Sequence, residues 1–155
     1  MGRVRRHGGG RRGGGNGILW AVPIHRCAPT LDVTDPASIA AAAAAARDVT
    51  LVVNNAGGAN GATVLKDSPA LRDLFEVNFF GPLAVAHAFA PALAANGGGA
   101  LVNVLSVLSW IGVGDGYSAT KAALWSATNT QRLSLASESG TMRGSSQARG
   151  VRAVA

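Results

Sequence analysis

Tyr117 and Lys121 form a pair that could exchange protons with a substrate. They lie four positions apart in the segment YSATKAAL, so their side chains share one face if the segment is helical. A free phenol has a pKa of about 10, too high for proton exchange at neutral pH, but a nearby ammonium group favours the phenolate. The pair is therefore a candidate general acid/base. Taken alone, the same spacing is also typical of ordinary surface pairs.

Two further polar residues occur where the sequence is otherwise apolar. Ser106 follows the apolar run LVNVL, eleven residues before Tyr117, where its hydroxyl could hold a carbonyl oxygen and support the charge that develops on it. Asn78 lies inside an apolar helical pattern, and a buried amide needs hydrogen-bond partners or it costs stability. A structural hydrogen bond explains Asn78 equally well.

Two loop segments have the composition of a ligand-contacting backbone. The segment NNAG, residues 54–57, follows the apolar run VTLVV, and its glycine would let a cofactor pass close to the main chain. A plain turn explains the same residues. Asp32, in the middle of LDV, offers a carboxylate to an adenine amino group, or it simply leads into a loop.

The hydrophobic pattern predicts short strands that would position these residues. The strands are expected at LDV, at VTLVV and at LVNVL, which are residues 31–33, 49–53 and 101–105. VTLVV is β-branched and continuously apolar, which is typical of a strand buried on both faces in a parallel sheet.

Helices are expected between and after these strands. Asp35 and Pro36 start a helix of about a dozen residues, and Ser68 and Pro69 start a second. Gly81 and Pro82 are expected to break or kink the second helix, which resumes over residues 84–95; a third helix spans residues 117 to about 136. Alternating strands and helices predict an α/β fold with a parallel sheet. Ligands gather at the carboxyl ends of such strands, so residues 54–57 and Ser106 are expected at one edge.

Five segments in this order resemble one known family. LDVTDPASIAAAA, LVVNNAG, EVNFFGPLA, LVNVLSVLSW and YSATKAAL are together similar to the short-chain dehydrogenase/reductase family, over about 110 residues from Leu31 to about Glu138. The resemblance implies a Rossmann-like, doubly wound parallel sheet. It also implies hydride transfer between NAD or NADP and a small-molecule carbonyl or alcohol substrate.

The resemblance implies roles for the four candidate catalytic residues. Tyr117 would be the general acid/base, and Lys121 would activate it and bind the nicotinamide ribose. Ser106 would orient the carbonyl, and Asn78 would hold a water that relays protons to Lys121. The gap between Ser106 and Tyr117 is about two residues shorter than is usual in the family. Ser109 is a second candidate for the serine, although it lies still closer to Tyr117 and off the end of the strand.

The resemblance also implies a cofactor cleft. Asp32 and Val33 would meet the adenine. Four loop residues would line the cleft: Asn54, Asn55, Ala56 and Gly57. No residue is assigned to a metal.

Both ends of the sequence depart from the family pattern. The stretch GGGRRGGGNG contains one G-x-x-x-G-x-G frame, but no apolar strand precedes it. Only 23 positions separate Gly9 from Asp32, whereas a βαβ unit takes about 30 or more. We therefore expect an incomplete Rossmann-like fold that lacks the first βαβ unit and a C-terminal lid. We hypothesise a truncated or frame-shifted gene, which resequencing of the locus would test.

The expected organisation is one partial domain between two basic ends. Residues 1–29 are expected to be disordered, residues 30–139 to form the dehydrogenase domain, and residues 140–155 to form an irregular tail in which VRAVA is a remnant strand at most. Without the strands that precede LDV in the family, the strand VTLVV is expected at the edge of the sheet. The alternative is that GILWAVPI takes the position of the first strand.

Composition limits the partners and the compartment. The net charge of +6 comes from arginines near the two ends, and neither end interleaves aromatic residues, so we expect no nucleic-acid binding. No apolar run reaches the roughly 18 residues of a membrane span, and Cys27 is the one cysteine. The expected location is cytoplasmic.

Two alternatives to an active dehydrogenase stay open. Loss of the phosphate loop removes binding energy that positions the reacting atoms, which puts activity in doubt. The chain would then be a non-catalytic remnant acting through protein contacts, or a basic-tailed nucleic-acid binder. A homo-oligomer is a further expectation, through the long helices.

Overall fold

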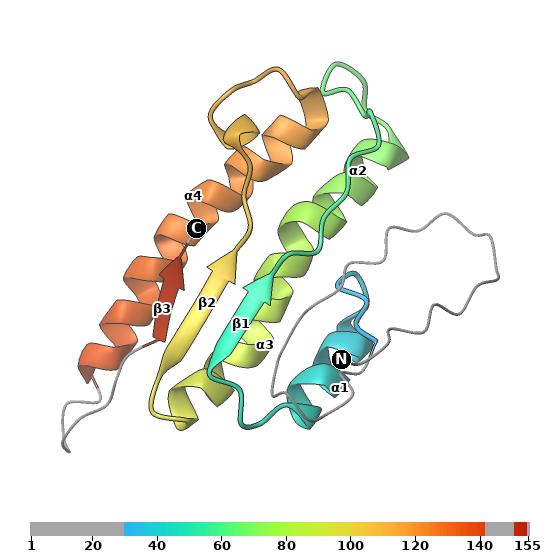
Figure 1. Ribbon diagram of the computed structural model, residues 1–155. Coiled ribbons are helices and arrows are strands. Elements are labelled where there is room, and N and C mark those ends of the chain that lie inside the picture. The colour runs from blue at the N-terminus through green and yellow to red at the C-terminus, as the bar shows by residue number, and fades with distance from the viewer. Residues whose placement is uncertain (1–29, 142–150, 155) are drawn as a thin grey trace, which may run out of the picture.

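The computed structural model describes residues 30–141 and 151–154, and it contains a parallel three-stranded sheet (Figure 1). The strands are β1 (Leu51–Asn54), β2 (Gly99–Asn103) and β3 (Val151–Val154), in the order β1-β2-β3. Val52 pairs with Leu101, and Leu101 pairs with Ala153. The predicted α/β class with a parallel sheet is confirmed. The carboxyl ends of the strands point to the same edge.

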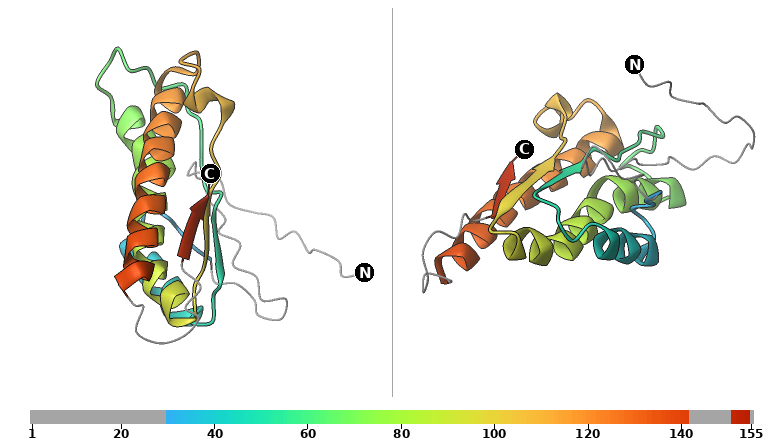
Figure 2. Two further views of the ribbon diagram at one scale, coloured as in Figure 1. Left: turned by 90° about the vertical axis from the view of Figure 1, so that its left-hand side faces the viewer. Right: turned by 60° about the horizontal axis from the view of Figure 1, so that its bottom comes forward.

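The described helices all lie on one face of this sheet (Figure 2). They are α1 (Pro36–Ala45), α2 (Pro69–Phe75), α3 (Gly81–Ala95) and α4 (Asp115–Thr141). α3 packs on β1 and β2, and α4 packs on β3. The buried core between α3 and the sheet includes Phe89, Leu93, Val52 and Leu101. Burial of side chains of this size contributes about 1.5–3 kcal/mol each.

β1 is the edge of the described sheet, as expected. The prediction that this strand is buried on both faces is wrong for Leu51, which is 49% exposed, because the described helices cover one face. The predicted strand at residues 31–33 is also not observed. Leu31 and Val33 are buried in the core, but no described strand lies beside them, and a strand needs a hydrogen-bonding partner.

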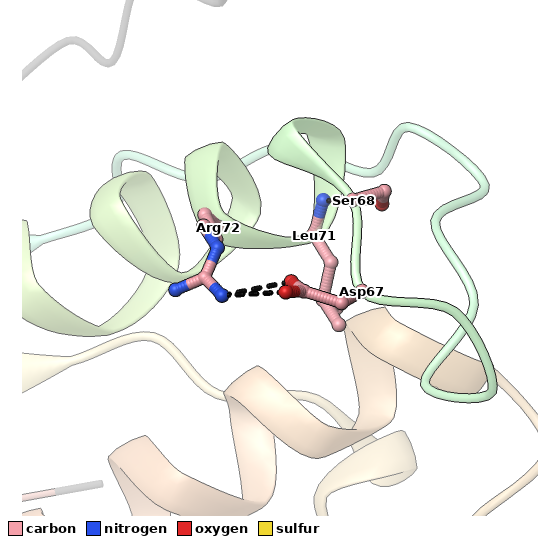
Figure 3. Close-up of polar contacts among 4 residues, drawn as sticks. All are labelled: Asp67, Ser68, Leu71 and Arg72. Carbon is pink, nitrogen blue, oxygen red and sulfur yellow. Dashed lines mark hydrogen bonds and ion pairs between the residues drawn. The ribbon is translucent and has the colours of Figure 1, made fainter.

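The start of α2 follows local capping chemistry (Figure 3). The Ser68 hydroxyl accepts a hydrogen bond from the Leu71 amide at 3.2 Å, and Pro69 occupies the first turn. The Arg72 guanidinium donates to both carboxylate oxygens of Asp67 at 2.8 Å. Both charged side chains are exposed, so solvent screens this pair and it contributes little to stability.

The predicted break at Gly81 and Pro82 is wrong, because a π-helical turn joins α2 to α3. This turn, η1 (Glu76–Phe80), is closed by a hydrogen bond from the Gly81 amide to the Glu76 carbonyl. Pro82 has no N–H group, so it cannot donate to the carbonyl of Asn78 four residues earlier. The wider turn absorbs the proline, and the chain stays helical from residue 69 to residue 95.

The continuous helical segment Pro69–Ala95 is long and apolar enough to cross a membrane, with a mean hydropathy of 1.4 in its most apolar stretch. The sequence contains no uninterrupted apolar run of this length, because polar residues such as Glu76 and Asn78 interrupt the segment. A helix in the core of a folded domain can be equally long and apolar. The α3 part of this segment packs on β1 and β2.

The C-terminal part differs from the predicted irregular tail. α4 continues to Thr141, and Val151–Val154 form β3, which pairs with β2. A remnant strand, the alternative at VRAVA, is therefore observed. The glycine-rich stretch, GILWAVPI and the other predictions for residues 1–29 lie outside the described residues.

Candidate active site

α4 brings Tyr117 and Lys121 together on consecutive turns. The Lys121 Nζ lies 5.9 Å from the centroid of the Tyr117 ring. Lys121 is 5% exposed, and its Nζ donates to the Val104 carbonyl at 2.9 Å. Burial lowers the pKa of Lys121. Among the described residues, no carboxylate lies within ion-pair distance of this ammonium.

Asn78 and Gly57 lie beside this pair. A Cβ atom added to Gly57 would lie 3.2 Å from Asn78 Oδ1 and 3.5 Å from Lys121 Nζ. Gly57 therefore leaves its main chain open where three segments meet, namely the loop after β1, the π turn and α4. A side chain at this position would crowd the Asn78 amide and fill the space above the lysine.

The Asn78 side chain makes structural hydrogen bonds. Its Oδ1 accepts from the Gly58 amide at 2.8 Å, and its Nδ2 donates to the Gly58 carbonyl at 2.8 Å and to Thr120 Oγ1 at 3.0 Å. Both amide protons are thus used within the protein. The residue four positions after Asn78 is Pro82, which has no N–H group, so the Asn78 main-chain carbonyl lacks its usual α-helical donor. This carbonyl is therefore a better candidate than the side chain to accept a hydrogen bond from a water.

The loop after β1 divides into inward and outward residues. Asn54 is buried, and its Nδ2 donates to the Pro82 carbonyl at 3.1 Å and to Asn103 Oδ1 at 2.8 Å. Ala56 is also buried, whereas Asn55 and Gly57 are exposed. Asn54 and Ala56 therefore anchor the loop, and Asn55 and Gly57 present it to a ligand.

The two candidate serines lie directly after β2. Ser106 caps the short 3-10 turn Val107–Ser109: its Oγ accepts from the Leu108 amide at 3.2 Å, and Ser109 Oγ accepts from the Ser106 amide at 3.4 Å. Ser109 is buried and Ser106 is half-buried. Ser106 lies two residues beyond Val104, whose carbonyl binds Lys121, so it is the better placed of the two.

Asp32 and Val33 lie in the turn before α1. The Asp32 carboxylate accepts from the Thr34 hydroxyl at 2.7 Å and from the Thr34 amide at 2.9 Å, and these hydrogen bonds lower the pKa of Asp32. Asp32 is exposed. Val33 is buried against Gly81, where an added Cβ would lie 2.9 Å from Val33 Cγ2. Val33 therefore packs on the helical segment that contains Asn78.

Sequence reasoning missed Asn103, which connects the site to the interior of the fold. Asn103 is directly opposite Asn54 in the register of β1 and β2. Its Nδ2 donates to Thr128 Oγ1 at 2.8 Å and to Gln131 Oε1 at 3.0 Å, both on α4. The asparagine inside LVNVL was the available signal, by the same argument that singled out Asn78.

An open groove of about 720 Å³ lies beside the site. Its lining is mainly apolar and includes Val64, Leu65, Leu108, Trp110, Val113 and Ala119. The α4 residues in it are Asp115, Ser118, Ala119 and Ala122, which lie on a different face of the helix from Tyr117 and Lys121. The groove therefore adjoins the site through Ser109, but neither Tyr117 nor Lys121 lines it.

Comparison with known proteins decides the family. The sequence model for the short chain dehydrogenases matches residues 24–142. The chain belongs to the short-chain dehydrogenase family. It is 40% identical over 116 residues to the short-chain dehydrogenase ptmH of Penicillium ochrochloron, and the match covers 68% of this chain and 41% of that protein.

Solved short-chain dehydrogenases share the fold. A short chain dehydrogenase from Burkholderia cenocepacia, crystallised with NADP, is 42% identical with a TM-score of 0.65, covering 69% of this chain and 46% of the other. A short-chain dehydrogenase from Sphingobium yanoikuyae, in complex with NADPH, is 28% identical with a TM-score of 0.59. The match covers 69% of this chain and 44% of that protein. The chain thus matches less than half the length of these relatives.

Proposed function

We propose that this chain is an NAD(P)-dependent oxidoreductase that transfers hydride between a nicotinamide cofactor and a carbonyl or alcohol substrate. The observation that supports it best is the buried Lys121 ammonium beside Tyr117, at the carboxyl ends of β1 and β2. A structural ion pair would explain a buried lysine without catalysis. Here the partner is a neutral carbonyl, which leaves the charge to act on the phenol.

The described residues fit the nicotinamide end of a dinucleotide. Gly57 leaves an open approach beside Asn78 and Lys121, and Asn55 is exposed next to it. The Lys121 ammonium has donors to spare for ribose hydroxyls, because one hydrogen bond goes to Val104. The bound cofactor would supply the hydride. The relatives crystallised with NADP and NADPH support this cofactor class, with NAD kept as the alternative.

The chain's own residues then perform the acid/base part of the reaction. As the carbonyl carbon of the substrate receives a hydride, its oxygen takes the proton of the Tyr117 hydroxyl. The Lys121 ammonium stabilises the resulting phenolate. Ser106 donates to the same oxygen and supports its developing charge. A water on the Asn78 carbonyl would return a proton through Lys121.

An assay with matched variants tests this proposal. The purified chain should oxidise NADPH or NADH in the presence of a panel of aldehydes and ketones. Tyr117→Phe should lower kcat by about 100-fold or more, with little change in cofactor affinity. Ser106→Ala should lower kcat, and Ser109→Ala should lower it less. Activity that survives Tyr117→Phe would overturn the mechanism.

A second candidate function is a non-catalytic remnant that acts by protein contact. The described sheet ends at β1 with an unpaired edge, and Leu65, Trp110 and Val113 are highly exposed. No turnover with any carbonyl, in a cooperatively folded chain, would favour this candidate. A homo-oligomer through exposed helix residues such as Phe80 and Leu133, and a cytoplasmic location, remain proposals alongside either function.

A further inference from the structure

Asp115, the first residue of α4, has a backbone conformation that side chains rarely adopt. Its φ is +48°, and no other described residue except glycine has a positive φ. Asp and Asn tolerate this region better than other residues, but such conformations are strained and persist only where surrounding contacts hold them. The structure therefore contains contacts that select this conformation.

Those contacts come from the loop after β1, about fifty residues earlier in the chain. Asp115 Oδ1 accepts from the Val64 amide at 2.8 Å, and the Thr63 side chain also acts on the same carboxylate. Together they hold the pKa of Asp115 below its usual range. The carboxylate is ionised at neutral pH, which strengthens a hydrogen bond from an amide.

The next residue makes a second link to the same loop. The Gly116 amide donates to the Ala62 carbonyl at 3.1 Å. A Cβ atom on Gly116 would lie 2.5 Å from that oxygen and 2.9 Å from Leu71 Cδ1, so the two main chains meet where only glycine fits. Residues 62–64 and 115–116 thus form a two-bond junction, and Tyr117 is the next residue.

The N-terminal end of the same loop is hydrogen-bonded to Asn78, one of the candidate catalytic residues. Gly58 is bonded through both its amide and its carbonyl to the Asn78 side chain. Asn60 Nδ2 donates to the Ala70 carbonyl at 2.7 Å, which ties the middle of the loop to α2. Residues 58–64 are therefore fixed at Asn78, at α2 and at the start of α4.

We propose that Asp115 is a positioning residue, which fixes the start of α4 and thereby sets Tyr117 against the loop that contains Gly57. Its carboxylate acts through the backbone and does not touch substrate or cofactor. The catalytic consequence rests on the proposed function, since Tyr117 must work at a defined distance from a cofactor lying along residues 54–57. Displacement of a catalytic group by about 1 Å costs up to about 100-fold in rate.

Three substitutions separate the carboxylate from the backbone conformation. Asp115→Asn keeps an acceptor oxygen and tolerates positive φ. Asp115→Gly adopts the same φ without strain but has no acceptor. Asp115→Ala loses both features. The experiment measures amide hydrogen exchange in the full-length chain by NMR, with the amides of β1 and β2 as internal references, together with kcat and KM for carbonyl reduction.

In Asp115→Gly, the Val64 and Gly116 amides should exchange about tenfold faster or more, while the strand amides keep their protection. The value of kcat should fall about 10- to 100-fold with a smaller change in the KM for the dinucleotide. Asp115→Asn should keep most of the wild-type amide protection and most of the wild-type kcat. Unchanged protection of Val64 in Asp115→Gly would overturn the junction, and unchanged kcat despite lost protection would overturn the positioning role.

The two proposals fail in different ways. If the wild-type chain reduces no carbonyl with either dinucleotide, the proposed function is wrong, while amide exchange still decides whether Asp115 fixes the start of α4. If the wild type is active and Asp115→Asn is as impaired as Asp115→Gly, the hydrogen-bond acceptor is not what positions Tyr117.

Discussion

At the scale of single residues, Lys121 has the most unusual environment. It is buried with a neutral hydrogen-bond partner, and burial of a charge costs stability that one hydrogen bond offsets only in part. A residue that costs stability and lies beside a phenol is expected to serve catalysis.

The first prediction follows from this cost. Lys121→Met keeps the length of the side chain and removes the charge, so the free energy of unfolding in urea at neutral pH should change by no more than about 1 kcal/mol. Carbonyl reduction should fall by about 100-fold or more. A loss of several kcal/mol would mean that the lysine is structural.

The lowered pKa of Lys121 predicts a pH dependence of stability. Between the pKa in the folded chain and the ordinary value of 10.5, the unfolded chain binds more protons than the folded one, so stability should rise with pH across that window. Lys121→Met should lack this rise. The check is a series of urea titrations of both proteins from neutral pH to about pH 10.5; parallel curves would contradict the effect of burial.

At the scale of elements, buried amides hold the layers in register. Asn54 joins β1 to the Pro82 carbonyl of α3, and Asn103 joins β2 to Thr128 and Gln131 of α4. The two asparagines also bond to each other across the sheet. This network sets the distance between the helices that contain Asn78 and Lys121.

The network gives a third prediction. Asn103→Ala removes the hydrogen bonds that Asn103 makes with Asn54, Thr128 and Gln131, so the free energy of unfolding should fall by about 2–4 kcal/mol. Asn129→Ala is the control, since the Asn129 side chain bonds only within α4, and its effect should stay within about 0.5 kcal/mol. Equal effects of the two substitutions would argue against the network.

A fourth prediction concerns the contact between α3 and the segment before α1. An added Cβ on Gly81 would lie 2.9 Å from both the Cγ2 and the main-chain oxygen of Val33. Gly81→Ala should therefore lower the free energy of unfolding by about 1–3 kcal/mol. Gly112 has open space around it, so Gly112→Ala should be neutral. Chemical denaturation of both variants provides the measurement.

The sequence predicts those features that depend on local chemistry. Asp35 and Ser68 start helices because their side chains cap the nearest amides, and the four-residue spacing of Tyr117 and Lys121 is a property of any helix. Other features depend on distant neighbours and could not be predicted in this way. They are the absence of a strand at residues 31–33, the exposure of Leu51 and the conformation of Asp115. The π turn at Asn78 was missed because a Gly-Pro pair in sequence does not show whether a wider turn will absorb it.

At the scale of the whole molecule, the described sheet has three strands and an edge at β1. The aligned part of the chain corresponds to 41% of the Penicillium relative and 46% of the Burkholderia structure, and it contains the residues assigned to the acid/base chemistry. We infer that this part of the fold suffices to hold a dinucleotide.

Thermal unfolding of the purified chain, with and without NADPH or NADH, tests this inference most directly. Trp110 and Trp125, whose rings lie 6.1 Å apart near the start of α4, provide the fluorescence signal. At about 100 times the dissociation constant, a dinucleotide that binds the folded chain should add about 2.7 kcal/mol to its stability. We expect one cooperative transition that moves to higher temperature with at least one dinucleotide. A cooperative transition indifferent to both dinucleotides would contradict the inference.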